Sequence, residues 1–165
     1  MLESQISGVA PEVFLDAMSS LASGVAVVTA ADRLGDPCGL LVSSLCSYSA
    51  SPPSVLLAVD QRSRSYAPLL AAEEFAVHLL HASQSEVASV FAGRGDHKFA
   101  AQDWAWDGPV PRLGGALVYL RCARAKAVEH GDHAILVGNV IGCDVSPGEP
   151  LVYFRRSLAW RLAAD

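Results

Sequence analysis

The sequence lacks the patterns that several common protein classes need. Its four cysteines lie far apart and form no Cys-x-x-Cys pair, so a zinc site is not expected. We expect these cysteines to be reduced thiols. No Gly-x-Gly-x-x-Gly follows a predicted strand and no Gly-Lys-Ser/Thr loop occurs, so a nucleotide would have to bind without the familiar glycine turn. No Ser-His-Asp arrangement or nucleophile elbow can be assigned, which leaves a hydrolase without support.

Long apolar runs and excess positive charge are also missing. Residues 1–5 show no secretory pattern, and runs such as 24–31 and 55–59 are too short to span a bilayer, so we expect a cytoplasmic protein outside the membrane. A formal charge of −5 argues against duplex nucleic acid as a partner. With 52% hydrophobic residues, we expect one domain over residues 1–165 whose apolar surface is partly covered by a partner subunit.

Short β-branched runs dominate the periodicity, and the helices are inserted between strands without regular alternation. A parallel βαβ sheet is therefore not expected, and the fold class predicted is mainly β, an antiparallel barrel or sandwich with peripheral helices. Residues 96–113 are interpreted as a long ordered loop, and Ser83-Gln-Ser-Glu86 as a capping box. We expect helices at 11–21, 66–72 and 83–91, and strands at 24–31, 40–49, 55–60, 75–80, 116–128, 134–145 and 151–154.

Two neighbouring segments are candidates for ligand binding. The Arg62-Ser-Arg-Ser65 cluster precedes a predicted helix, and its guanidinium and hydroxyl groups could hold a phosphate; a solvated loop that caps the helix is the alternative. In the predicted strand 42–48, Ser43, Leu45 and Ser47 would share one face, a mixture that suits a flat ring with polar edges. A strand with one polar face explains the same pattern.

Two further segments offer weaker signals. His133 follows Gly131-Asp132 at a predicted hairpin tip, where its imidazole could donate to an amide carbonyl; an ordinary surface histidine is the alternative. Residues 153–160 mix aromatic side chains with arginines, which suits stacking on adenine or nicotinamide, although an amphipathic closing segment would look the same. Two histidine pairs, His130 with His133 and His78 with His81, lack an evident acidic or cysteine partner, so no metal is expected. Arg94-Gly-Asp96 carries no meaning as an adhesion tripeptide.

The order of these motifs resembles the flavin reductase family, the small reductase components of two-component flavin-dependent monooxygenases. The resemblance runs from about residue 12 to 160. It rests on Phe14 to Ala30, Gly39 with Ser43-Ser44, Ser51-Pro-Pro53, Arg62-Ser-x-Ser65, Phe75-Ala-Val77, Phe91-Ala-Gly93, Lys98-Phe99, Gly114-Gly-Ala116, and Gly131-Asp-His133 through Val137-Gly138.

The resemblance implies an antiparallel split β-barrel of the Greek-key, FMN-binding type that forms a homodimer and binds FAD or FMN near the subunit interface. It implies that hydride passes from NADH, or from NADPH, to the flavin, which then leaves for a separate monooxygenase. Residues Val42, Ser43, Ser44, Leu45 and Ser47 would line the flavin ring system. The flavin phosphate would contact Asp60, Arg62, Ser63 and Ser65, with Phe91, Lys98 and Phe99 close by. His133 would be the catalytic residue near the nicotinamide, a side completed by Tyr153, Phe154, Arg155 and Arg156.

Two positions depart from the family pattern. Leu45 stands where such reductases commonly have Phe, which would weaken stacking on the flavin, and His78 stands where the strand usually continues with Asn. Two other functions stay open beside the reductase. One is a flavin-binding module without turnover, and the other is an enzyme of the pyridoxamine-phosphate oxidase type, in which the Arg/Ser cluster would hold a different phosphate.

Overall fold

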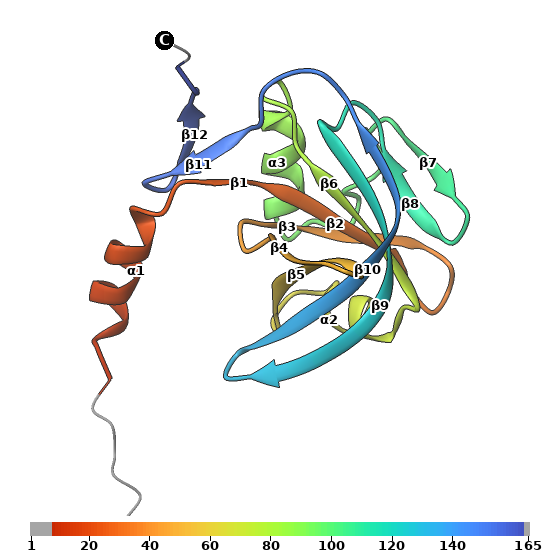
Figure 1. The fold of residues 1–165 in the computed structure, drawn as a ribbon, viewed down its shortest axis with the longest axis horizontal. Helices are drawn as coiled ribbons and strands as arrows, with labels where there is room; N and C mark the ends of the chain where they lie inside the picture. The colour runs from red at the N-terminus through yellow and green to blue at the C-terminus, as the bar shows by residue number, and fades with distance from the viewer. Residues whose placement is uncertain (1–7, 164–165) are drawn as a thin grey trace, which may run out of the picture.

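A computed structural model describes residues 8–163, most of which form a twisted β-barrel with helices at its edges (Figure 1). The main sheet has the spatial order β3-β2-β6-β9-β10-β5-β4, and every neighbouring pair is antiparallel. The expected mainly β, antiparallel split-barrel class is thereby confirmed. The strands of this sheet are β2 (Ala26–Ala31), β3 (Pro37–Val42), β4 (Cys46–Ala50), β5 (Pro53–Asp60), β6 (Glu74–Leu79), β9 (Val118–His130) and β10 (His133–Val145).

Shorter elements surround the barrel. A three-stranded sheet pairs β1 (Ser23–Gly24) with β11 (Val152–Phe154) and β11 with β12 (Ser157–Trp160). In Figure 1 this sheet and helix α1 (Pro11–Ser19) stand beside the barrel. The other helices are α2 (Tyr66–Ala71) and α3 (Ser85–Ala92). No helix within 8–163 is long and apolar enough to cross a membrane, and the predicted absence of a secretory signal falls on residues outside that range.

Burial on both faces of the sheet explains why a strand such as β2 has a continuous apolar sequence. Ala26 through Ala30 of β2 are all buried, because β2 lies in the sheet with the barrel interior on one face and α3 on the other. The interior cluster includes Val28, Leu57, Phe75 and Leu136. A second cluster beneath α3 contains Val25, Val27, Leu80, Phe91, Phe99 and Leu113.

The long hairpin β9–β10 is confirmed, with Gly131 and Asp132 as its two-residue turn between the paired His130 and His133. Strand β10 also pairs with β5, and this register sets His133 opposite Asp60. The hairpin tip is therefore fixed beside the segment that leaves β5.

The prediction of a single strand over residues 40–49 is wrong, because residues 43–45 interrupt it and separate β3 from β4. At the break, the Ser44 hydroxyl accepts a hydrogen bond from the Ala58 N–H at 2.9 Å and donates to the Ala58 carbonyl at 3.1 Å. A side chain thus replaces a backbone partner for β5. The expected alternation of Ser43, Leu45 and Ser47 on one strand face does not exist.

Two further local predictions are wrong. The expected loop 96–113 contains a hairpin of β7 (Trp104–Asp107) and β8 (Val110–Leu113), which is anchored by Asp107 to side chains of β9. The capping box also fails, since α3 begins at Ser85 without a side-chain cap. The Ser83 hydroxyl lies instead 2.8 Å from Nδ1 of His81.

Candidate flavin-binding groove

A groove of about 700 Å³ opens where the barrel is split. Strand β3 and the β4–β5 pair are the two ends of the main sheet, and no backbone ladder joins them. The groove is lined by residues 37–41 of β3, by residues 60 and 62–65 after β5, and by residues 91–96, 98 and 99 at the end of α3 and beyond. An edge strand leaves alternate backbone N–H and C=O groups unpaired, so the groove wall offers polar backbone atoms.

The carbonyl of Gly39 holds this site together. It accepts hydrogen bonds from the Ser65 hydroxyl at 3.0 Å and from Lys98 Nζ at 3.2 Å. These side chains take the place of a neighbouring strand at the edge of β3. A Cβ at position 39 would lie 2.8 Å from the Val28 carbonyl and 3.1 Å from the Phe91 ring, so only glycine fits without a shift. The site therefore depends on close backbone approach at Gly39.

Positive charge gathers along the groove. Arg62 Nη2 lies 2.8 Å from Asp60 Oδ2, and the hydrogen bonds that the Arg62 side chain donates lower the pKa of Asp60 to about 2. Arg64 forms an ion pair with Asp96 across the groove. Both pairs are exposed, so water screens them and an incoming phosphate could compete for the guanidinium groups.

Lys98, which follows α3 in the chain, also lines the groove. Its Nζ donates to the Phe91 carbonyl at 2.9 Å as well as to Gly39, and burial lowers its pKa. The ammonium also lies 5.9 Å from the centre of the Phe91 ring, which meets Phe99 edge to face. The aromatic pair is buried and fixes the lysine from one side. Lys98 thus places a partly desolvated positive charge in the groove.

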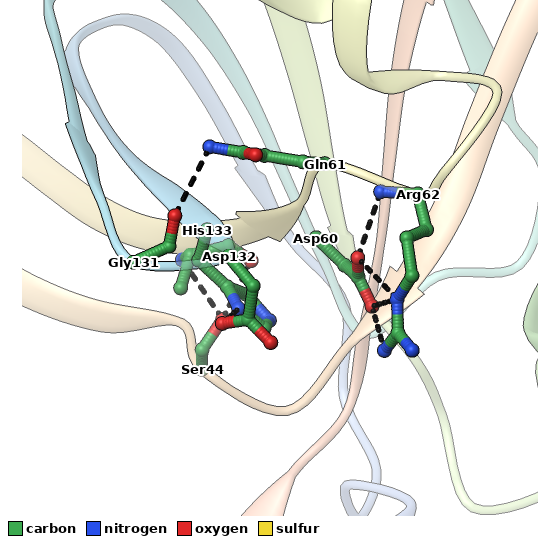
Figure 2. A network of polar contacts seen from close by, with 8 residues as sticks. Ser44, Asp60, Gln61, Arg62, Gly131, Asp132 and His133 are labelled. Carbon is green, nitrogen blue, oxygen red and sulfur yellow. Dashed lines mark hydrogen bonds and ion pairs between the residues drawn. The ribbon is translucent and has the colours of Figure 1, made fainter.

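His133 lies next to this groove at the hairpin tip. Its Nδ1 lies 2.7 Å from Asp132 Oδ1. Figure 2 shows the side chains of His133 and Asp132 next to each other. Gln61 ties the tip to the arginine segment, since its backbone N–H donates to the Asp132 carbonyl at 3.0 Å and its amide to the Gly131 carbonyl at 3.3 Å. The hydrogen bond with His133 lowers the pKa of Asp132. The carboxylate orients the ring, so that Nε2 is the nitrogen left for a ligand.

Of the sequence-predicted site residues, seven line the groove: Asp60, Arg62, Ser63, Ser65, Phe91, Lys98 and Phe99. The segment 42–47 lies beside it. The Val42 side chain is buried in the core and Leu45 packs against that core, while Ser43 and Ser47 are exposed. Ser44 contacts Ala58, two residues before Asp60, so the segment borders the same edge of β5.

The C-terminal candidates lie elsewhere. Tyr153 packs against the cluster beneath α3, and Arg155 and Arg156 line a separate hollow beside α1. Phe154 packs against Trp160 of β12 with ring centres 5.1 Å apart. None of these four side chains lines the groove.

Sequence reasoning missed several residues of the groove. Arg64 belongs to the Arg/Ser cluster but was not assigned a contact, and Arg94 was visible only within a tripeptide without meaning. Cys38 also lines the groove, where burial raises the pKa of its thiol to about 11 and keeps it protonated. Their approach depends on the path of residues 91–98, for which local sequence gives no signal.

Several known proteins are similar to this chain in sequence and in fold. Residues 18–160 match the family model described as flavin reductase like domain. The flavin reductase (NADH) of Kitasatospora aureofaciens is 36% identical over 162 residues, covering 93% of this chain and 84% of the relative. The reductase component of 4-hydroxyphenylacetate 3-monooxygenase from Thermus thermophilus is 38% identical over 154 residues, covering 90% and 97%.

A solved structure, the NADH:FAD oxidoreductase of Streptomyces globisporus in complex with NAD and FAD fragments, superposes with a TM-score of 0.86. The two are 31% identical, and the match covers 96% of this chain and 98% of that one. The chain spans about half the length of another relative, the probable flavin reductase of Rhizobium meliloti, at 35% identity (88% of this chain, 47% of the relative). The chain belongs to the flavin reductase family.

Proposed function

We propose that this chain is an NADH:flavin oxidoreductase that reduces FAD or FMN and passes the reduced flavin to a separate monooxygenase. The observation that carries the proposal is the groove at the split of the barrel, where Arg62, Arg64 and Lys98 gather beside a glycine-lined strand edge. The relatives supply the reaction, since those compared above are NADH-dependent flavin reductases or reductase components of monooxygenases by name.

The groove fits a flavin nucleotide. Its volume falls within the range of about 300–1,000 Å³ typical of small-molecule sites. The hydroxyls of Ser63 and Ser65 and the cations of Arg62 and Lys98 would hold the phosphate, since charge and directed donors then act together. The segment 42–47 would support the ring system along the edge of β5, with backbone groups and the exposed Ser43 and Ser47.

When bound, the flavin supplies an electron-accepting ring that takes hydride from NADH. The protein needs only to orient the two partners and exclude water. In the neutral ring Nδ1–H donates to Asp132, which fixes the tautomer, so Nε2 would accept a hydrogen bond from the carboxamide N–H of the nicotinamide. The Gln61 contacts keep this tip beside the phosphate-binding segment.

Anaerobic mixing of the protein with NADH and either FAD or FMN tests the proposal. Rapid loss of the yellow flavin absorbance supports a reductase. Flavin that binds and stays oxidised with NADH would support a binding module without turnover. Bound FMN that stays oxidised with NADH but is reduced by pyridoxamine phosphate would support the oxidase alternative. Adding a flavin-dependent monooxygenase with oxygen then tests whether the reduced flavin is released in usable form.

We also propose a homodimer in the cytoplasm. Helix α1 buries none of its residues against its own chain, and Phe14, Leu15 and Leu21 are more than half exposed. Ile135 and Ile141 of β10 are exposed as well. A second copy that covers such surfaces would remove them from water. The four cysteines are unpaired in the structure, which supports a reducing compartment.

A further inference from the structure

The turn between β11 and β12 has an unusual sequence for its geometry. Arg155 and Arg156 occupy its two central positions with φ angles of 48° and 61°. Two positive φ angles define a type I′ hairpin turn, which strongly favours Asn-Gly. Any residue that carries a Cβ is sterically disfavoured in this region. Two arginines at these positions indicate that their side chains serve a purpose other than forming the turn.

The turn is docked on the last residues of α1. The Arg155 N–H donates to the Ser19 carbonyl at 2.8 Å. Together with Asp16, Ser19 and Ser20, the two arginines line a hollow of about 340 Å³. Within residues 8–163, neither arginine forms an ion pair with a carboxylate, although Asp16 borders the same hollow. Both arginines therefore line one hollow, and within residues 8–163 no carboxylate holds their guanidinium groups.

An aromatic pair lies beside one of these cations, Arg155. The Arg155 guanidinium lies 5.4 Å from the centre of the Phe154 ring, whose other neighbour is the Trp160 indole. Trp160 Nε1–H donates to the Phe154 carbonyl at 2.9 Å, which fixes the indole, yet the residue stays 46% exposed. Guanidinium forks recognise phosphates, and exposed aromatic faces stack on nucleobases. The combination is typical of a surface that binds a nucleotide.

We propose that the hollow between α1 and the β11–β12 turn binds the adenosine diphosphate part of a dinucleotide. Arg155 and Arg156 hold the diphosphate, and Trp160 stacks on the adenine. The inference rests on the proposed function, because both NADH and FAD carry an adenosine diphosphate. The hollow shares no lining residue with the groove, so its ligand can be measured separately from flavin reduction.

Replacing the two arginines by the residues that the turn prefers tests the proposal directly. The variant Arg155→Asn/Arg156→Gly keeps the turn, so it should fold with an unchanged or higher Tm. Titration of the protein with ADP, followed by calorimetry, should show affinity about tenfold or more weaker in this variant, since two charge-assisted contacts are lost. Arg155→Lys/Arg156→Lys, which keeps charge but loses the planar fork, should fall between the two.

The charge-matched control is Arg33→Asn/Lys126→Asn, which removes two exposed positive charges far from the hollow in sequence and outside its lining. It should bind ADP like the unchanged chain. No ADP binding by the unchanged chain, or equal loss in control and test variants, would overturn the site.

Paired substrates identify the dinucleotide. If the ligand is NADH, the Asn-Gly variant raises KM for NADH about tenfold and leaves KM for reduced nicotinamide mononucleotide unchanged. If the ligand is FAD, the variant weakens FAD and spares FMN. An effect on ADP with none on either dinucleotide would overturn the assignment. A chain that binds ADP through this turn but never reduces flavin would instead refute only the proposed function.

Discussion

At the residue scale, His78 is a fully buried histidine that joins three strands. Its Nδ1 lies 3.1 Å from the Val27 carbonyl in β2, and its Nε2 accepts a hydrogen bond from the Leu113 N–H of β8 at 3.0 Å. The ring must therefore be neutral, with the proton on Nδ1. An asparagine amide can also donate and accept, so the Asn that the family resemblance leads us to expect at this position could make the same two contacts.

His78 should make the protein sensitive to mild acid. Burial lowers its pKa to about 4, below its ordinary value, so the unfolded chain takes up the proton first. Stability from the neutral ring is complete above about pH 6.5 and is lost as the pH falls toward 4, roughly 2 kcal/mol between pH 7 and 5. Urea unfolding at several pH values measures this slope. His78→Asn should flatten it, whereas the exposed His130→Asn should not; an unaltered slope in His78→Asn would contradict the assignment.

Lys98 should distinguish phosphorylated from unphosphorylated flavin. Replacing it by methionine keeps the stem that packs beside Phe91 but removes the charge in the groove. We expect FMN affinity to fall about tenfold or more while riboflavin affinity stays within about twofold, because only FMN offers a phosphate. Fluorescence titration of both flavins gives the ratio. Parallel loss for FMN and riboflavin would show that Lys98 only supports the fold.

His133 should affect turnover without affecting flavin binding. We expect His133→Ala to lower kcat with NADH about tenfold or more, because a positioned hydrogen-bond partner of the carboxamide is lost. The flavin dissociation constant should stay unchanged, since the phosphate segment is intact. His130→Ala is the matched control on the other side of the same turn, and its kinetics should match the unchanged chain. If His133→Ala retained full turnover, His133 would have no part in the reaction.

At the element scale, the helices and hairpins that depend on local hydrophobic periodicity and turn residues could be predicted from the sequence. Helices over 66–72 and 83–91 and the long hairpin β9–β10 follow from periodicity and turn residues, and the structure contains them. The break at Ser44 could not be predicted, because it depends on a hydroxyl meeting Ala58 fourteen residues away. Similarly, seven groove residues followed from the motif order, while Arg64 and Arg94 join the site through loop paths without a local signal.

The β7–β8 hairpin was missed for the same reason, and its anchor can be tested at Gly108. This glycine has a φ of 59°, and a Cβ there would lie 2.8 Å from the Arg121 guanidinium. Arg121 Nε lies 2.6 Å from Glu74 Oε2, and its Nη1 3.4 Å from Asp107 Oδ1. A substitution would displace that guanidinium from both acids.

We expect Gly108→Ala to destabilise the protein by about 2 kcal/mol, the sum of the backbone penalty and a disturbed, half-buried ion pair. Thermal unfolding measures it. Gly35→Ala is the control, since Gly35 has a φ of 84° with no atom near its would-be Cβ, and it should show the backbone penalty alone. Equal losses at both positions would show that Arg121 adjusts freely and that the hairpin does not depend on it.

At the scale of the whole molecule, α1 raises the question of what stabilises it. An isolated helix of nine residues is marginal in water. Here all of its large apolar side chains are exposed, and its contact with the rest of the chain includes the Arg155–Ser19 hydrogen bond. A second copy of the chain would supply the missing apolar partner, as the proposed homodimer requires.

Phe14→Ser should therefore weaken the dimer more than it weakens the barrel. Phe14 is 56% exposed and contributes nothing to either core cluster of its own chain. In analytical ultracentrifugation the unchanged chain should sediment as a dimer, and the variant should dissociate at concentrations about tenfold or more higher, because a buried aromatic anchor is lost from the interface. Leu34→Ser, which removes an 86% exposed side chain from the β2–β3 turn, should leave the dimer intact. A monomeric unchanged chain, or a variant that dimerises equally well, would show that α1 is covered by something other than a second copy.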